Sequence, residues 1–244
     1  MKDYFSTASD KYAQFRPTYP IELFDFLLQL CAKKEKAWDC GTGNGQVAGE
    51  LANSFEQVYA TDISTNQLSQ GIQKENIHYT KQAAEKTNFP DAYFDLVTVG
   101  QAVHWFEFDR FYAEAKRVLK KDAVIAIFGY GLFRSDPVTN EFIEHFYNDI
   151  IGPYWATERR YFQDSYKTIP FPFEEIETPP FTMKHTWSFE RLLGYLNTWS
   201  AVKAFEKEKG ENPVELIKND LFNSFGELGS VEFPILLRVG RNPE

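Results

Sequence analysis

A run of alternating glycines near residue 40 is the part of the sequence whose residue types and spacing point most directly to chemistry. The segment reads Trp38-Asp39-Cys40-Gly41-Thr42-Gly43-Asn44-Gly45. Glycines at these positions allow a tight turn and let the backbone approach a bound ligand closely. The run alone is ambiguous, because dinucleotide sites also use glycine turns and because an ordinary structural turn would have the same residues.

The neighbours of this turn narrow the kind of ligand that it could bind. Gln46 stands where the dinucleotide fingerprint G-x-G-x-x-G requires its last glycine. Asp39 shortly precedes the first glycine, and a carboxylate there would repel a pyrophosphate but attract an ammonium or sulfonium group. The turn also lacks a lysine or arginine that could meet phosphates. The pattern therefore favours a ligand without phosphate groups.

A second acidic residue, Asp62, follows the turn by about 20 residues, at the end of the next predicted strand. A carboxylate at that place can accept hydrogen bonds from both hydroxyls of an adenosine ribose. It would serve NAD and S-adenosylmethionine (SAM) equally well, so it indicates adenosine rather than either cofactor. The alternative is that Asp62 only caps the helix that begins near Ser64, since aspartate is a favourable N-cap residue.

Alternating strands and helices in the first half of the chain must position these residues. Apolar runs predict strands at residues 37–40, 57–61, 77–80, 94–99 and 123–128. Helical spacing of apolar residues predicts helices at 21–31, 46–55, 64–71 and 109–119. We therefore expect an α/β protein with a doubly wound, mostly parallel sheet covered on both faces, with the order β-α-β-α-β-α-β-α-β. Ligands bind such sheets outside the carboxyl ends of the strands, where the turn and Asp62 lie.

The alternation ends near residue 132, and the rest of the chain is rich in aromatic residues. We expect helices at 138–151 and 188–209, and an antiparallel strand pair at 181–187 and 231–239 that closes the edge of a seven-stranded sheet. The prediction is one domain over residues 1–244. Residues 1–20 would form an N-terminal lid, and residues 132–180 a helical cap inserted after the fifth strand.

At these motifs the sequence resembles the class I SAM-dependent methyltransferases, of the methyltransferase type 11 kind. Asp39 to Gly45 resemble the family's D-x-G-x-G-x-G motif, and Tyr59 to Ser64 its second-strand motif. Residues 84–97 resemble the stretch A-E-x-x-P-F-x-x-x-x-F-D-L-V, with Asn88 in the usual proline place. Arg117 to Lys120 also fit the family. The resemblance implies a Rossmann-like methyltransferase fold and SAM as the cofactor.

The resemblance also implies which residues bind SAM. The backbones of Gly41 and Gly43 would approach its methionine part. Asp62 would hold the ribose, with the following isoleucine against the adenine, and Ala84 and Glu85 would border the adenine. The full expected set is Arg16, Asp39, Gly41, Gly43, Asp62, Ile63, Ala84, Glu85, Gln101 and His104.

Three positions in this set carry further implications. Gln101 and His104, after the fourth strand, would flank the methionine and the methyl group. Arg16 would pair with the SAM carboxylate, which a guanidinium can bind through two hydrogen bonds. Many relatives have an aspartate before the alanine at 84, where this chain has Ala83. The contact with the adenine amino group would then fall to Glu85 or to a backbone carbonyl.

A narrower resemblance is to the subgroup that includes trans-aconitate methyltransferase. It is carried by Tyr12 to Pro20, Ala102 to Phe106 and Gly194 to Ala201. We therefore expect a small-molecule acceptor, with a carboxylate as one candidate. Methyl transfer is an in-line displacement, so the protein must mainly align the reactants and exclude water. A carboxylate is already ionised at neutral pH and needs no base, whereas a phenol, hydroxyl or amine would benefit from one.

The candidate catalytic residues follow the fourth and fifth strands. His104 is the candidate base, Trp105 a wall of the methyl site, and Tyr130 a contact to the substrate. The alternative for His104 is a structural histidine that is hydrogen-bonded beside Trp105. Arg159 and Arg160 in the cap are either solvated or, if one of them faces the pocket, an indication of an anionic acceptor.

The bulk composition argues against other partners. The net charge is -9 and no long basic stretch occurs, which disfavours nucleic acid. No apolar run reaches the roughly 18 residues of a membrane span, and the N-terminus lacks the apolar stretch of a secretory signal, so a cytoplasmic location is expected. The two cysteines are too few for a zinc site, so no metal is expected. An NAD-dependent oxidoreductase and a SAM-binding protein without transferase activity stay open as alternatives.

Overall fold

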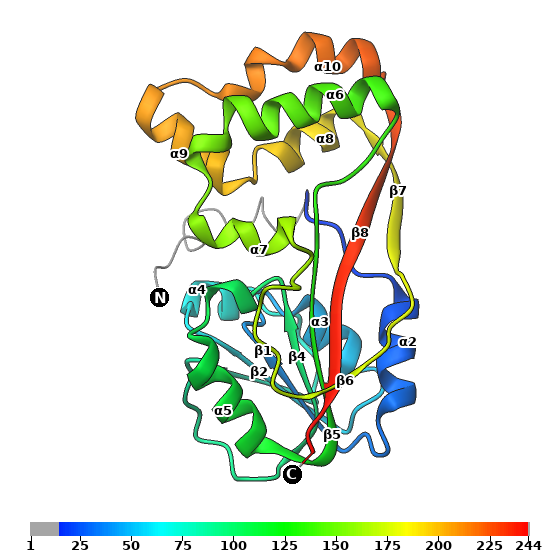
Figure 1. The fold of residues 1–244 in the computed structure, drawn as a ribbon, viewed down its shortest axis with the longest axis vertical. Coiled ribbons are helices and arrows are strands. Elements are labelled where there is room, and N and C mark those ends of the chain that lie inside the picture. Colours follow the sequence, from blue (N-terminus) through cyan, green and yellow to red (C-terminus); the bar gives the residue numbers. More distant parts are fainter. Residues whose placement is uncertain (1–14, 244) are drawn as a thin grey trace.

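A single mixed sheet runs through the molecule. The computed structural model describes residues 15–243, so most of the expected lid over residues 1–20 lies outside the described residues. The strand order is β3-β2-β1-β4-β5-β8-β6, with β7 also paired to β8 (Figure 1). The strands are β1 Lys36–Cys40, β2 Gln57–Asp62, β3 Ile77–Lys81, β4 Phe94–Gly100, β5 Leu119–Tyr130, β6 Glu174–Ile176, β7 Thr182–Ser188 and β8 Leu228–Arg241.

The first five strands are parallel and are covered by helices on both faces. The helices of this part are α2 Ile21–Leu30, α3 Gln46–Leu51, α4 Thr65–Ser69 and α5 Phe108–Val118. Along β5, Val124 and Ala126 pack in one core with α2 and α3, whereas Ile125 and Ile127 pack in another core with α5. Successive side chains of a strand point to opposite faces, and both faces of β5 are buried, so the strand is a continuous apolar run. The predicted doubly wound α/β sheet is confirmed.

The prediction is wrong in several details of this sheet. It has eight strands instead of seven, because the short β6 pairs with the end of β8. No helix separates β3 from β4. An irregular connection with an isolated bridge between Ala83 and Lys86 takes its place. Helix α3 ends at Leu51 and not near residue 55, since a turn begins at Ala52.

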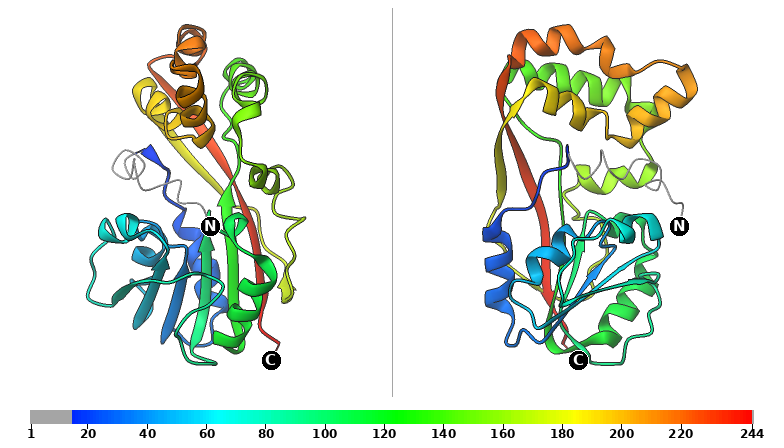
Figure 2. Two further views of the ribbon diagram at one scale, coloured as in Figure 1. Left: turned by 90° about the vertical axis from the view of Figure 1, so that its left-hand side faces the viewer. Right: turned by 180° about the vertical axis from the view of Figure 1, so that it is seen from behind.

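The predicted antiparallel pair at the end of the chain is confirmed, but its long member lies inside the sheet. The first half of β8 pairs with β7, and the second half pairs with β5 on one side and β6 on the other. Both views of Figure 2 show β8 and β7 leaving the sheet together and rising to a group of helices. Strand β8 therefore connects the sheet to these helices.

These helices form a separate core beyond the carboxyl ends of the parallel strands (Figure 1). Large side chains such as Trp187, Tyr195, Trp199 and Phe233 fill it. The helical elements after β5 are α6 Pro137–His145, the π-helix η2 Phe146–Ile150, the 3-10 turns η3 Gly152–Tyr154 and η4 Thr157–Arg159, α7 Arg160–Gln163, α8 Phe189–Leu196, α9 Ser200–Lys209, η5 Pro213–Leu216 and α10 Lys218–Phe225. The sequence predicted neither α10 nor β6.

The expected single helix over residues 188–209 is wrong, because α8 and α9 are separate helices. Side chains just beyond α8 bond to its last carbonyl groups. The Asn197 amide donates to the Leu193 carbonyl at 2.8 Å, and the Thr198 hydroxyl donates to the Tyr195 carbonyl at 2.7 Å. The backbone amides of Asn197 and Thr198 donate to the same two carbonyls, at 3.0 and 2.9 Å, so each carbonyl has a second donor where α8 ends.

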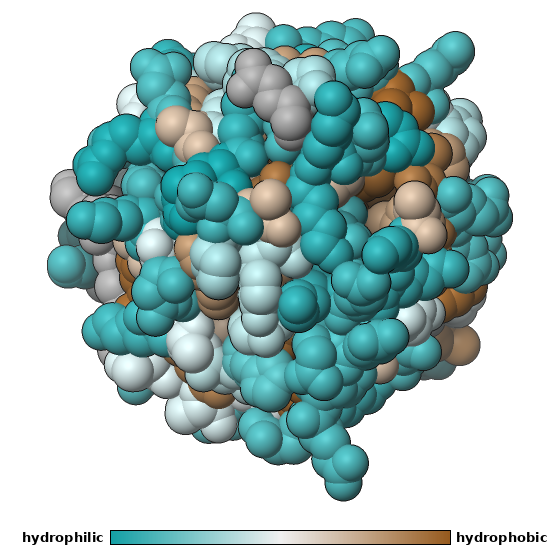
Figure 3. All heavy atoms as spheres, turned by 90° about the horizontal axis from the view of Figure 1, so that it is seen from below, coloured by the Kyte–Doolittle hydropathy of each residue, from teal (hydrophilic) through white to brown (hydrophobic). Residues whose placement is uncertain are grey.

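The amino ends of the parallel strands lie at the opposite end of the molecule. That face shows mostly hydrophilic side chains, with apolar atoms scattered among them (Figure 3). Within residues 15–243, no helix is long and apolar enough to cross a membrane.

Candidate functional site

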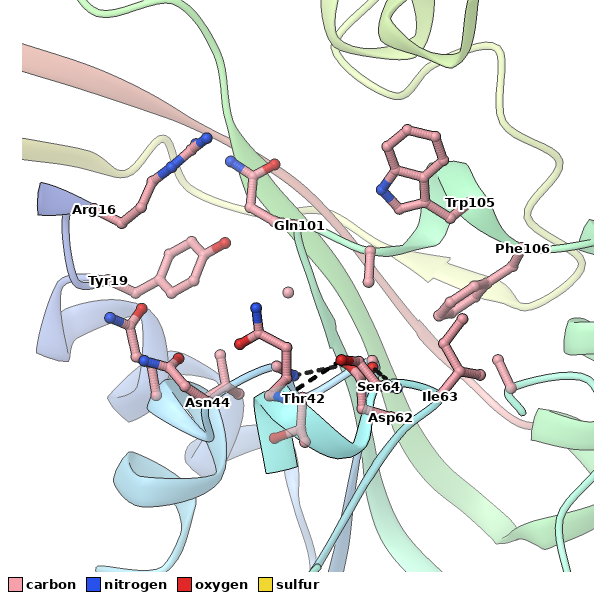
Figure 4. A pocket seen from close by; sticks show the side chains of 18 of the residues that line it. Arg16, Tyr19, Thr42, Asn44, Asp62, Ile63, Ser64, Gln101, Trp105 and Phe106 are labelled. Atoms are coloured by element: carbon pink, nitrogen blue, oxygen red, sulfur yellow. Dashed lines mark hydrogen bonds between the residues drawn. The ribbon is translucent and has the colours of Figure 1, made fainter. Parts of the chain in front are cut away.

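A cavity of about 150 Å³ opens at the carboxyl ends of β1, β2, β4 and β5. Figure 4 shows Thr42, Asn44, Asp62 and Ser64 along one side of it, with Arg16 opposite. The lining residues are Arg16, Tyr19, Gly41, Thr42, Gly43, Asn44, Gln46, Val47, Asp62, Ile63, Ser64, Gln67, Gln82, Ala84, Gly100, Gln101, Ala102, Trp105, Phe106 and Tyr130. We call this space the first cavity.

The glycine turn forms one wall of the first cavity. All three glycines of the turn have positive φ: Gly41 at +70°, Gly43 at +56° and Gly45 at +79°. Residues other than glycine rarely adopt such angles. The amides of Gly41 and Thr42 donate to the Thr61 carbonyl at 2.8 and 2.9 Å, which ties the turn to the end of β2. The turn is therefore fixed in shape, and its backbone faces the cavity.

Asp62 holds this wall together and also faces the cavity (Figure 4). Its Oδ2 accepts a hydrogen bond from the Gly43 amide at 3.0 Å, and its Oδ1 accepts one from the Ser64 amide at 2.8 Å. The N-cap of α4 is Ser64 rather than Asp62, since the Ser64 side chain accepts from the Gln67 amide. A carboxylate oxygen has more than one acceptor site, so these two bonds do not by themselves prevent either oxygen from also accepting from a ligand.

Asp39 lies below the turn and does not line the first cavity. Its Oδ2 accepts from the Thr42 hydroxyl at 2.5 Å and from the Ala48 amide at 3.1 Å, and its Oδ1 accepts from the Thr98 hydroxyl at 3.0 Å. Burial raises the pKa of this carboxyl to about 6, although these hydrogen bonds lower it. Asp39 therefore braces the turn from beneath, and its charge can act on a ligand only through the turn.

The predicted adenine side is only partly assembled as expected. Ile63 and Ala84 line the first cavity together with Gln82, which follows β3. Glu85 does not line it, and its carboxylate accepts a hydrogen bond from the Glu107 amide at 3.1 Å. The structure therefore brings Gln82 and Ala84 to this cavity, but not Glu85.

The far wall consists of residues from the segment before α2 and from the end of β5. The Arg16 Nη1 donates to the Tyr130 hydroxyl at 3.2 Å. The Tyr19 ring packs edge-on against Phe128, with the ring centres 4.7 Å apart. The structure thus brings Arg16 and Tyr130 together, although more than a hundred residues separate them.

A second cavity of about 60 Å³ adjoins the first. Arg16, Gln101 and Trp105 line both cavities, so these side chains form the junction between them. Gln101 has φ +56°, an uncommon conformation for a residue other than glycine, and such strain often marks functional positions. The remaining residues that line the second cavity are His104, Trp155, Ala156, Arg159, Phe162, Trp199 and Ser200.

His104 belongs to the second cavity and not to the first. Its ring packs against Trp105 and Phe162, and its Nδ1 is buried without a hydrogen-bond partner among the described residues. Burial, with the nearby Arg159 charge, lowers the pKa of His104 to about 3. The imidazole is therefore neutral at neutral pH and a poor proton acceptor, which argues against its expected role as a general base.

Arg159 brings a positive charge to the second cavity. Its Nε donates to the Tyr147 hydroxyl at 3.0 Å, and its guanidinium lies 4.6 Å from the Trp155 ring centre and 4.4 Å from that of Phe162. These contacts fix the orientation of the guanidinium. Arg160 does not line this cavity, and its Nη2 donates to the Tyr161 hydroxyl at 3.1 Å.

Comparison with known proteins shows the family. Residues 38–127 match the methyltransferase domain family. A protein of Dictyostelium discoideum that is named as a methyltransferase is 33% identical, over 98% of this chain and 95% of its own length. A solved structure from Anaeromyxobacter dehalogenans, described as a type II methyltransferase, is 38% identical with a TM-score of 0.87, over 93% of this chain and 98% of that one. The chain belongs to the class I SAM-dependent methyltransferases.

A more distant structure agrees with this methyltransferase fold. The phosphoethanolamine N-methyltransferase 2 of Haemonchus contortus, solved with S-adenosylhomocysteine (SAH), has a TM-score of 0.52 at 16% identity, over 100% of this chain and 58% of that one. At this identity the likeness concerns the fold alone. SAH is the demethylated form of SAM.

Several residues that line the cavities of this methyltransferase were not singled out from the sequence as cofactor contacts. Gln82 could have been found from its position, because it directly follows β3 at the same edge of the sheet where Asp62 ends β2. Phe106 is buried in the core and also lines the first cavity. Tyr19 and Ser200 lie within the stretches that carry the subgroup resemblance, but neither was singled out as a residue that would reach a cavity.

We expect a methyl group at Gly41 to damage both the fold and the site. A Cβ there would lie 2.6 Å from the Ala102 Cβ, at a φ of +70°. Gly41→Ala should lower the free energy of unfolding by about 1–3 kcal/mol, as for other strained backbone positions, and should weaken SAH binding. Urea unfolding and calorimetric titration with SAH measure the two effects.

Gly210→Ala is the matched control for Gly41→Ala. Gly210 ends α9 with φ +76°, and an added Cβ there meets nothing within 4 Å. Its substitution should cost backbone strain alone and leave SAH binding unchanged. Equal loss of stability in the two variants, with SAH binding intact in both, would contradict the importance of the close approach to Ala102.

Proposed function

We propose that this methyltransferase transfers the methyl group of SAM to the carboxylate of a small acid, with SAM in the first cavity and the acid in the second. The observation that carries the proposal is the make-up of the second cavity. The Arg159 guanidinium lines it, the Arg16 guanidinium lies at its junction with the first cavity, and none of the described residues that line it is an aspartate or glutamate. Such a wall favours an anionic acceptor and disfavours a protonated amine.

The first cavity fits the cofactor by its chemistry. Asp62 offers carboxylate oxygens for the ribose hydroxyls, Ile63 and Ala84 offer apolar surface for the adenine, and the glycine turn offers open backbone beside the methionine part. Arg16 is suited to the methionine carboxylate. When bound, SAM supplies the electrophilic methyl group, and the protein's part is to bind and orient both partners and to exclude water.

The junction is the place where the two ligands would meet. Gln101 and Trp105 form it together with Arg16, and the hydrogen bond from the Gln101 side-chain amide to the Tyr130 carbonyl, at 3.3 Å, orients the Gln101 side chain. A carboxylate acceptor attacks without losing a proton, so the low pKa of His104 is no obstacle. His104 is then better suited to a neutral hydrogen bond with the acid, and Trp105 and Tyr130 to walls around the reacting atoms.

The resemblance of Tyr12 to Pro20, Ala102 to Phe106 and Gly194 to Ala201 to the subgroup that includes trans-aconitate methyltransferase supports the same acceptor class. The helical residues within 132–180, with Arg159 and Trp155 over the second cavity, would serve as the predicted cap. Residues 15–20 would form the described part of the predicted lid. The absence of the last fingerprint glycine at Gln46, together with the family, disfavours the NAD-dependent alternative.

A product assay tests the proposal. The protein is incubated with SAM and, separately, with aliphatic and aromatic carboxylic acids, phenols and primary amines, and the release of SAH is measured. We expect SAH and a methyl ester with at least one acid, the ester being identified by mass and by its cleavage in mild alkali. Methylated phenol or amine as the only product contradicts the carboxylate. SAH that raises the melting temperature without turnover on any acceptor indicates a SAM-binding protein without transferase activity.

Arg159 provides the matched variants for the acid that the assay identifies. Arg159→Gln should raise the KM for the acid about tenfold or more, since a hydrogen bond to a charged group contributes about 1.5–3 kcal/mol. The affinity for SAH should stay within error, because Arg159 does not line the first cavity. Arg159→Lys keeps the charge but loses the planar guanidinium fork, so its KM for the acid should lie between those of the wild type and Arg159→Gln.

A further inference from the structure

Phe15 packs directly on a glycine of α8. A Cβ built on Gly194 would lie 2.4, 2.5 and 2.6 Å from three atoms of the Phe15 ring. These separations are far below van der Waals contact, so the ring can occupy this place only because residue 194 lacks a side chain. Phe15 is half-buried there and packs against the core of the helical group.

The residues on either side of this contact lead to the junction of the two cavities. Arg16 follows Phe15, and its guanidinium lies 5.5 Å from the centre of the Tyr195 ring, which follows Gly194. The same guanidinium donates to the Tyr130 hydroxyl. Neighbouring residues of one segment thus contact neighbouring residues of α8, and Arg16 is held between α8 and the end of β5.

The segment is anchored again after Arg16. The Tyr19 ring packs on Phe128 at 4.7 Å and lies 6.0 Å from the centre of the Tyr130 ring. Between the two anchors the segment rises from α2 toward the helical group (Figure 1). The Tyr19 anchor belongs to the sheet, whereas the Phe15 anchor belongs to the helical group, so the position of Arg16 depends on both.

We propose that Gly194 is a positioning residue for cofactor binding, which acts by seating Phe15 on α8 and so holds Arg16 at the junction of the two cavities. This inference rests on the proposed placement of SAM in the first cavity. A larger residue at 194 would push the Phe15 ring off α8, and Arg16 would lose the geometry with which it meets the methionine carboxylate. The adenosine end of the ligand, bound at β2 and β3, would be unaffected.

Two probes separate this role from general damage to the site. SAH carries the methionine carboxylate, whereas adenosine lacks the methionine part entirely. In Gly194→Ala we expect the Kd for SAH to rise about tenfold, because that is the effect of losing one charge-assisted hydrogen bond. The Kd for adenosine should stay within twofold of the wild-type value. Gly152→Ala is the matched control, because a Cβ at Gly152 meets only the Tyr147 carbonyl oxygen, at 3.7 Å. It should leave both Kd values unchanged.

A double-mutant cycle with Phe15 tests the cause of the effect. Phe15→Ala removes the ring, so adding Gly194→Ala to it should cost little more SAH affinity than Phe15→Ala alone. An additive double variant, an unchanged SAH affinity in Gly194→Ala, or equal losses for SAH and adenosine would each overturn the inference. If the wild-type protein binds no SAH, the proposed function fails instead.

Discussion

Replacement of Asp62 by alanine should weaken SAH binding by about 100-fold or more. The carboxylate is expected to accept hydrogen bonds from both ribose hydroxyls, and bonds to a charged group contribute about 1.5–3 kcal/mol each. Asp62→Ala also frees the amides of Gly43 and Ser64, which its two oxygens hold at 3.0 and 2.8 Å. The glycine turn would then lose part of its shape as well. Calorimetric titration of wild-type and variant protein with SAH measures the change.

Asp62→Asn is the comparison that separates binding from local structure. An amide keeps one acceptor oxygen and the shape of the side chain, so either Gly43 or Ser64 retains a partner. We expect this variant to keep most of the stability of the wild type and still to lose about tenfold in SAH affinity, because one acceptor and the charge are gone. If the Kd of Asp62→Ala for SAH is within threefold of the wild-type value, the Asp62 carboxylate does not bind the ribose.

The parallel half of the sheet could be predicted because each strand there carries its own local signal. Strand β5, for example, is apolar on both faces because helices cover both. Strand β6 has no such signal. Its residues Glu174, Glu175 and Ile176 form a strand only because the end of β8 offers them partners. Likewise, the break between α8 and α9 depends on how Asn197 and Thr198 bond to the preceding turn.

The first cavity was more predictable than the second for a related reason. Several of its polar residues end a strand or closely follow one, and the carboxyl ends of parallel strands meet at one edge of the sheet. The second cavity draws Arg16, His104, Arg159 and Trp199 from segments that only the packing of the helical group brings together. Sequence indicated that Arg159 or Arg160 could face a pocket, but that Arg159 is the one at the second cavity depends on its stacking on Trp155 and Phe162.

Asp39 was predicted to attract a cationic ligand, and its burial leads to a different and testable property. In the folded protein the pKa of this carboxyl is about 6, against an ordinary value of 3.8, because burial disfavours the charged form. The folded state therefore binds the proton more tightly than the unfolded state does. Asp39 contributes its full stabilisation below about pH 4, and this contribution is lost as the pH rises toward 6. Over that window the loss is about 3 kcal/mol, at 1.36 kcal/mol for each unit of pKa shift.

Asp39→Asn should remove this pH dependence without unfolding the protein. The amide oxygen can accept from the Thr42 hydroxyl and the Ala48 amide, as Oδ2 does now. The Thr98 hydroxyl can then accept from the new amide group and donate to the Trp38 carbonyl, from which it already lies 3.5 Å away. Urea unfolding of both proteins between about pH 4 and pH 7 should show the variant gaining about 3 kcal/mol relative to the wild type, since every other titrating group is shared. Parallel stability curves would mean that Asp39 keeps an ordinary pKa and that water reaches it beneath the glycine turn.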